Sequence, residues 1–73
     1  MKANICGKKI RELRKKDQLG QVELSAELSV SYDIDINQSD ISEIERGVRG
    51  VKDFELKAFA EIFNVSLDFL LED

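Results

Sequence analysis

The sequence contains no proline, no histidine and no tryptophan, and it has only four glycines and one cysteine among its 73 residues. With no proline and only four glycines, little interrupts a helical pattern. A lone cysteine, Cys6, excludes an internal disulfide and suits a reducing compartment. We expect it to act as a small apolar residue near the core. No apolar run approaches the about 20 residues of a membrane span, and the N-terminus lacks a signal peptide's apolar core. We therefore expect a cytoplasmic protein.

The missing residue types also limit the chemistry. Because there is no histidine, one cysteine and no phosphate-cradling glycine loop, the carboxylates lack partners for acid–base catalysis, so we expect neither an enzyme nor a cofactor. Asp33, Asp35 and Asp40 lack the glycine and the terminal glutamate of a calcium loop, so we expect no metal site. A chain of 73 residues suits a single domain, residues 1–73, near the lower limit of independent folding. Met1 and a well-marked C-terminal helix favour a complete small protein.

The charge is distributed unevenly along the chain. Charged residues make up 36% of the sequence and the net charge is −4. Residues 1–20 carry +5, residues 21–45 carry −7, residues 46–57 carry +2 and residues 58–73 carry −4. Because phosphate binding depends on where positive charge lies on the surface, the negative total does not exclude nucleic acid as a partner.

Residues 37–47 predict a short helix with both ends marked. Asn37 is a favoured N-cap, and Ile36 and Ile41 have the spacing of a hydrophobic staple. Gly47 can adopt the left-handed conformation that ends a helix. Only Ile41 and Ile44 between these marks are large and apolar, so one narrow stripe is buried. The outward side chains would be Gln38, Ser39, Ser42 and Glu43, which suit contact with a surface.

Four further helices follow from the apolar spacing. Residues 4–16 predict an amphipathic helix with an apolar stripe at Ile10 and Leu13 and a basic remainder. A second helix begins after Gly20 with Leu24 and Leu28 in the core, and Val22 exposed. Residues 53–63 and 67–71 complete the set, the last with Ser66 as its N-cap.

Residues 29–36 allow two interpretations. Their apolar residues alternate with polar ones, which is typical of a strand, but one short strand without a partner would be marginal. We expect the second helix to continue to about Tyr32, followed by a loop whose Ile34 and Ile36 enter the core. The fold class predicted is therefore all-α, with five short helices.

Four segments in this order resemble the lambda-repressor-like (Xre/Cro-type) helix-turn-helix DNA-binding domains. They are GKKIRELR at 7–14, QVELSAEL at 21–28, ISEIERG at 41–47 and NVSLD at 64–68. Each pattern alone is common, but the four together in this spacing are quite specific. The resemblance implies a helix-turn-helix whose reading helix, residues 38–46, lies in the major groove of double-stranded DNA.

The resemblance also implies residue roles. Base contacts would come from Gln38, Ser39, Ser42 and Glu43. Phosphate contacts would come from Gln21, Lys8, Lys9, Lys15, Arg46, Arg49 and Lys52. Arg14 would form an ion pair with Glu45 and brace the reading helix. Homodimerisation through the last helix, at Leu67, Phe69 and Leu71, would set two reading helices about one DNA turn apart on a palindromic operator. No small-molecule effector is evident.

Three features depart from the family pattern. Gly20 stands where threonine is usual, the link from Leu28 to Asn37 is about six residues longer, and the reading helix carries Asp40, Glu43 and Glu45. Carboxylates repel phosphate, so a monomer should bind weakly and should depend on dimerisation and on the basic segments.

Two functions remain open. One is a sequence-specific transcriptional regulator, a repressor that blocks a promoter. The alternative is a protein-interaction module of the same fold whose acidic third helix binds a basic partner protein. The position of the basic residues separates them, because a ring of Lys8, Lys9, Lys15, Arg46, Arg49 and Lys52 around the open face of the third helix would favour DNA.

Overall fold

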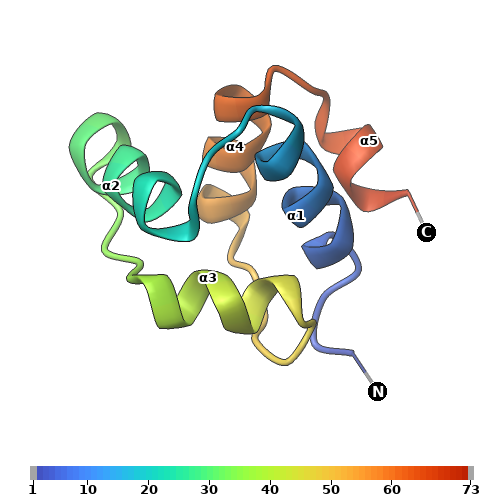
Figure 1. Ribbon diagram of the computed structural model, residues 1–73. Coiled ribbons are helices and arrows are strands. Elements are labelled where there is room, and N and C mark those ends of the chain that lie inside the picture. Colours follow the sequence, from blue (N-terminus) through green and yellow to red (C-terminus); the bar gives the residue numbers. More distant parts are fainter. Residues whose placement is uncertain (1, 73) are drawn as a thin grey trace.

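The chain folds into five α-helices, and no strand occurs among residues 2–72, which the computed structural model describes (Figure 1). The all-α prediction is thus confirmed. The helices are α1 (Gly7–Lys16), α2 (Gln21–Tyr32), α3 (Gln38–Glu45), α4 (Asp53–Phe63) and α5 (Leu67–Leu71). Met1, on which the expectation of completeness partly rested, lies outside the described residues. None of these helices is long and apolar enough to cross a membrane.

The core forms because each helix turns one apolar stripe inward. Ile10 of α1, Phe59 of α4 and Leu70 of α5 are fully buried. Cys6 belongs to the same cluster, and burial is the main reason why the pKa of its thiol is raised. Such a thiol is a packing group, as the sequence predicted. The other buried apolar residues are Leu24, Leu28, Ile34, Ile36, Ile41, Ile44, Ala58, Ala60 and Phe63.

The long link between α2 and α3 is partly helix and partly loop. α2 continues to Tyr32, and Asp33 ends it in the left-handed conformation with φ +55°. The Ile34 amide then donates to the Leu28 carbonyl at 3.0 Å, which turns the chain back toward the core. Ile34 and Ile36 are both buried, so the helix-then-loop prediction is confirmed and the strand interpretation is wrong.

The start of α1 was predicted wrongly, because the helix begins at Gly7 and not at Asn4. Asn4 Oδ1 accepts from the Gly7 amide at 2.7 Å, so its side chain serves the first turn from outside the helix. A Cβ on Gly7 would lie 2.0 Å from the Ile44 carbonyl oxygen. Glycine therefore permits the N-terminus of α1 to touch the C-terminal end of α3.

Candidate nucleic-acid interface

α3 is fixed at both of its ends by local hydrogen bonds. The Asp40 amide donates to Asn37 Oδ1 at 2.9 Å, and the Asn37 amide donates to Asp40 Oδ2 at 3.1 Å, which forms a capping box. Gly47 has φ +79°, and its amide donates to the Ile44 carbonyl at 3.0 Å. The caps are those predicted, although the helix ends at Glu45 and Arg46 is the residue that caps it.

The outward side of α3 carries the four residues expected to contact bases. Figure 1 shows α3 along one edge of the molecule, with the other helices on one side of it. Ile41 and Ile44 are fully buried toward α1 and α2. Four polar side chains lie on the rest of the helix, exposed or half-buried: Gln38, Ser39, Ser42 and Glu43.

Arg14 braces the C-terminal end of α3 from α1. Its Nε lies 2.6 Å from Glu45 Oε2 and its Nη2 donates to Glu45 Oε1 at 3.1 Å, a two-point pair whose side chains are only 9% and 3% exposed. Arg14 Nη1 also donates to the Leu19 carbonyl at 2.8 Å. The hydrogen bond to Glu45 is the main cause of the raised pKa of Arg14. The expected ion pair is therefore present, and it joins α1, α3 and the turn before α2.

Gln21 extends this pair to the first residue of α3. Its Nε2 donates to Glu45 Oε1 at 3.2 Å, and its Oε1 accepts from Gln38 Nε2 at 3.4 Å. One side chain at the start of α2 thus connects both ends of the reading helix. We expected Gln21 to bind a phosphate. In the structure its side chain contacts Glu45 and Gln38, and one amide hydrogen is left to donate to another group.

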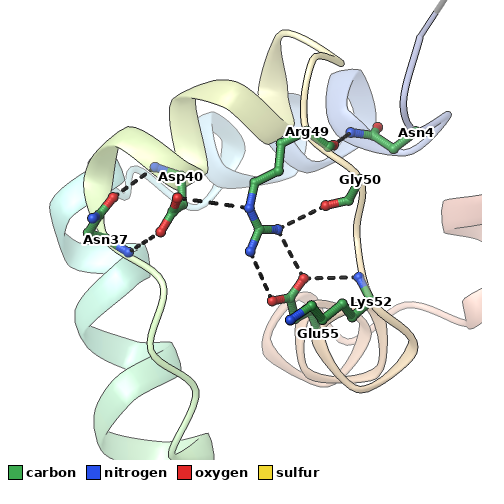
Figure 2. Close-up of polar contacts among 7 residues, drawn as sticks. All are labelled: Asn4, Asn37, Asp40, Arg49, Gly50, Lys52 and Glu55. Carbon is green, nitrogen blue, oxygen red and sulfur yellow. Dashed lines mark hydrogen bonds and ion pairs between the residues drawn. The ribbon is translucent and has the colours of Figure 1, made fainter.

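Arg49 occupies a second cluster, which the sequence did not predict (Figure 2). Its Nη1 and Nη2 donate to the two carboxylate oxygens of Glu55 at 3.0 and 3.1 Å, and Nη1 also donates to the Gly50 carbonyl at 2.9 Å. Its Nε lies 3.9 Å from Asp40 Oδ1. The guanidinium group therefore joins the loop after α3 to the first turns of α3 and α4. These contacts argue against the phosphate role expected for Arg49.

The buried carboxylate of Glu55 is held ionised by this cluster. Burial alone raises the pKa of Glu55, but the hydrogen bonds from Arg49 and from the Lys52 amide outweigh it, and the pKa is lowered. The Lys52 amide donates at 2.9 Å. A carboxylate that accepts several hydrogen bonds in its charged form is stabilised in that form.

α3 therefore presents fewer unpartnered carboxylates at its surface than the three in its sequence. Glu45 is paired with Arg14, and Asp40 caps its own helix and lies beside Arg49. Among residues 2–72, Glu43 is the carboxylate of α3 whose side chain makes no hydrogen bond or ion pair. Two of the three acidic groups that seemed to oppose DNA binding thus have structural roles.

Lys9 also differs from its expected role. Its Nζ donates to the Phe69 carbonyl at 2.8 Å and to the Glu72 carbonyl, and it lies 5.2 Å from the centroid of the Phe69 ring. The ammonium group caps the C-terminal end of α5, where a cation suits the helix dipole. These contacts argue against a phosphate role for Lys9, because its charge is already engaged at α5.

The remaining expected phosphate ligands have exposed side chains. Lys8 and Lys15 extend from α1, and Lys52 lies over Phe54 with its Nζ 5.8 Å from the ring centroid. Arg46 is exposed, and its Nε donates to Ser42 Oγ at 3.4 Å, at the end of the open side of α3. The predicted ring of six cations is therefore incomplete, since Lys9 and Arg49 are bound elsewhere.

α5 leaves apolar side chains in solvent. Leu70 is fully buried, whereas Leu67, Phe69 and Leu71 are 44%, 40% and 47% exposed. Ser66 caps the helix by accepting from the Phe69 amide at 3.0 Å. Three of the five residues of α5 are thus large apolar residues with side chains about half exposed.

Comparison with known protein families identifies the family to which the chain belongs. The family model for a helix-turn-helix domain matches residues 7–72, which contain all five helices of the structure. The comparisons with curated proteins and with solved structures gave no match. This assignment agrees with the resemblance to lambda-repressor-like domains and indicates a DNA-binding regulator. The chain belongs to the helix-turn-helix domain family.

Proposed function

We propose that the protein is a sequence-specific transcriptional repressor that binds the major groove through α3 and acts as a dimer on a palindromic operator. The observation that carries this proposal is the composition of the open side of α3. Its exposed groups are short polar side chains, while Asp40 and Glu45 are drawn into contacts with Arg49 and Arg14. Of the three carboxylates of α3, Glu45 is buried in its pair with Arg14, Asp40 is partly exposed beside Arg49, and the side chain of Glu43 makes no hydrogen bond or ion pair among residues 2–72.

Each of these side chains has a partner among the base edges. A glutamine amide can pair with adenine at two points, a serine hydroxyl can donate or accept, and a carboxylate accepts from the cytosine amino group. Gln38 is held by Gln21 at 3.4 Å, so its amide is oriented before DNA arrives. Prior orientation lowers the entropy cost of binding. Base selection is thus proposed for Gln38, Ser39, Ser42 and Glu43.

Dimerisation is proposed through the exposed apolar side chains of α5. Leu67 and Leu71 share one side of the helix and Phe69 lies on another, and these three residues would pack against a second copy in a two-fold interface. Two copies of α3 set about 34–36 Å apart would meet successive major grooves on one face of DNA. Doubling the contacts offsets the weak binding of one small module, and occupancy of a promoter would block transcription.

The alternative of a protein-interaction module gains no support from the structure. It needs an acidic α3 whose carboxylates are free to meet a basic partner. Asp40 and Glu45 are instead engaged within the chain. We therefore propose the DNA-binding function alone.

The test is a titration of genomic DNA fragments at several salt concentrations. Wild type is compared with Ser39→Ala/Glu43→Ala, and the matched control is Ser31→Ala/Glu27→Ala, which removes the same residue types from the exposed side of α2. Each lost base contact should weaken binding to the best fragment by about 1–3 kcal/mol, while the control should bind like wild type. Binding without a salt dependence, or equal binding by the α3 variant, would overturn the proposal.

A further inference from the structure

A groove lies between the C-terminal end of α2, the link that follows it and α4. Its apolar and aromatic lining includes Tyr32, Ile34 and Phe54, and its charged lining consists of Asp33, Lys57 and Glu61. The volume is about 390 Å³, within the range of about 300–1,000 Å³ that ligand pockets occupy. None of the residues proposed to contact bases lines this groove, so it is a surface separate from that of α3.

The long link between α2 and α3 builds one side of the groove. Asp33 turns the chain with φ +55°, Ile34 is buried behind it, and Tyr32 is half-buried. Phe54, which comes from α4, is 53% exposed. The groove thus involves the part of the chain that departs in length from the family pattern. Figure 1 shows α2 and this link at the end of the molecule opposite to α5.

Negative charge surrounds the groove. The pKa of Tyr32 is raised, first by burial and then by the charges of Glu61 and Glu27, so both carboxylates lie near its hydroxyl. Among residues 2–72, the side chains of Asp33 and Glu61 make no hydrogen bond or ion pair. Lys57 is the cation of the lining, and it stands four residues from Glu61 on α4, where opposite charges offset each other. The carboxylates therefore outnumber the cation.

We propose that this groove docks a basic segment of a partner protein by taking up an arginine side chain. A guanidinium group stacks on aromatic rings and forms paired hydrogen bonds with carboxylates. Tyr32 and Phe54 supply the rings, and Asp33 and Glu61 supply the carboxylates. Charge complementarity selects a basic partner over an acidic one. The proposal goes beyond DNA binding and does not depend on it, and the proposed dimer contact at α5 leaves the groove open.

The test is a titration of isotope-labelled protein with a capped tripeptide, acetyl-Leu-Arg-Leu-amide, followed by NMR. The amide signals of Tyr32, Ile34, Phe54 and Glu61 should shift and saturate. The same signals should not shift with acetyl-Leu-Glu-Leu-amide. Asp33→Asn/Glu61→Gln should weaken binding of the arginine peptide about 2- to 30-fold, the factor expected for two exposed ion pairs.

The matched control removes the same charges elsewhere. Glu12→Gln/Asp17→Asn changes an exposed residue of α1 and the residue that caps its C-terminal end, and it should bind the peptide like wild type. Asparagine is chosen for Asp33 because it tolerates the left-handed conformation. Phe54→Leu removes a ring without changing the charge and should weaken binding about 2- to 5-fold. Thermal unfolding verifies that each variant is folded.

The outcomes separate this proposal from the DNA-binding function. The absence of shifts with the arginine peptide, equal shifts with the glutamate peptide, or equal weakening in the control would overturn the groove as an arginine site. Equal shifts with acetyl-Leu-Ala-Leu-amide would indicate an apolar occupant and would overturn it as well. The variant Asp33→Asn/Glu61→Gln should bind DNA fragments like the control, so either function can fail while the other stands.

Discussion

Arg14 and Arg49 brace α3 from two sides, and they do so at different depths. Arg14 connects α1 to the last residue of α3, and its pair with Glu45 leaves 9% and 3% of the two side chains exposed. Arg49 connects the loop after α3 to α4; 24% of its side chain is exposed, and its carboxylate partner Glu55 is 4% exposed. One pair is closed to water on both sides, and the other on the acidic side only.

The difference in exposure predicts different roles for the two arginines, one in the stability of the fold and the other in the surface charge of α3. Removing one member of a closed pair leaves an uncompensated buried charge, which is costly. A guanidinium that is partly in water loses less when its partner is changed. Arg14 should therefore govern whether α3 stays docked. Arg49 should stabilise the loop after α3 and partly neutralise the exposed carboxylate of Asp40.

The largest effect is expected for Arg14→Ala. The variant leaves Glu45 buried without its partner, so the free energy of unfolding should fall by about 3 kcal/mol. Urea unfolding followed by circular dichroism measures the loss. The double variant Arg14→Met/Glu45→Leu should recover part of it, since an apolar pair leaves no buried charge. A double variant less stable than Arg14→Ala would contradict the account of this pair.

A smaller effect is expected for Arg49→Ala. The free energy of unfolding should fall by about 1–2 kcal/mol, because Glu55 loses two hydrogen bonds but keeps the Lys52 amide. Urea unfolding is again the measurement, with Lys57→Ala on the exposed side of α4 as the control. Stability equal to that of the control would show that Arg49 is free in solution and available to phosphate, contrary to the structure.

The pH dependence of stability tests the pair of Arg49 and Glu55. Because the pKa of Glu55 is lowered from its ordinary value of 4.5, its contribution is complete above that value and is lost as pH falls through the folded pKa. Between about pH 6 and about pH 3, wild type should lose more stability than Glu55→Gln, which lacks this titration. Parallel stability curves for the two proteins would contradict the assignment.

The smallest effect is expected for Asp40→Asn. Arg49 lies 3.9 Å from this partly exposed carboxylate, and such pairs contribute little, so stability should change by less than about 0.5 kcal/mol. The asparagine side chain can still accept from the Asn37 amide. Thermal unfolding checks the prediction, with Asn37→Ala as the comparison that removes the N-cap itself and should cost about 1 kcal/mol. A loss for Asp40→Asn as large as that of Asn37→Ala would show that the charge of Asp40 is structural.

Most of the fold could be predicted because its signals are local. Asn37, Gly47 and Ser66 mark helix ends through groups within a few residues of them, and the predicted bounds of α4 and α5 agree with the structure. Ile34 and Ile36 were placed in the core because alternating apolar residues without a partner strand need another place to be buried. The start of α1 was missed because Asn4 is held by carbonyls 40 and 45 residues away.

The site was only partly predictable for the same reason. The resemblance supplied the pair of Arg14 and Glu45, and the cap of α3 followed from Asn37. The engagement of Arg49 by Glu55 depends on how the loop folds over α4, and that of Lys9 depends on where α5 ends. Neither leaves a pattern in the sequence, because lysine and arginine are typical of phosphate sites and of ion pairs alike.

The central claim is that α3 selects a DNA sequence as part of a dimer. Repeated selection of bound duplexes from a random pool, followed by sequencing, tests it most directly. The account predicts an enriched motif of two inverted half-sites whose centres lie about 10 base pairs apart, and loss of that enrichment with Ser39→Ala/Glu43→Ala. A bound pool with the same composition as the starting pool would contradict it.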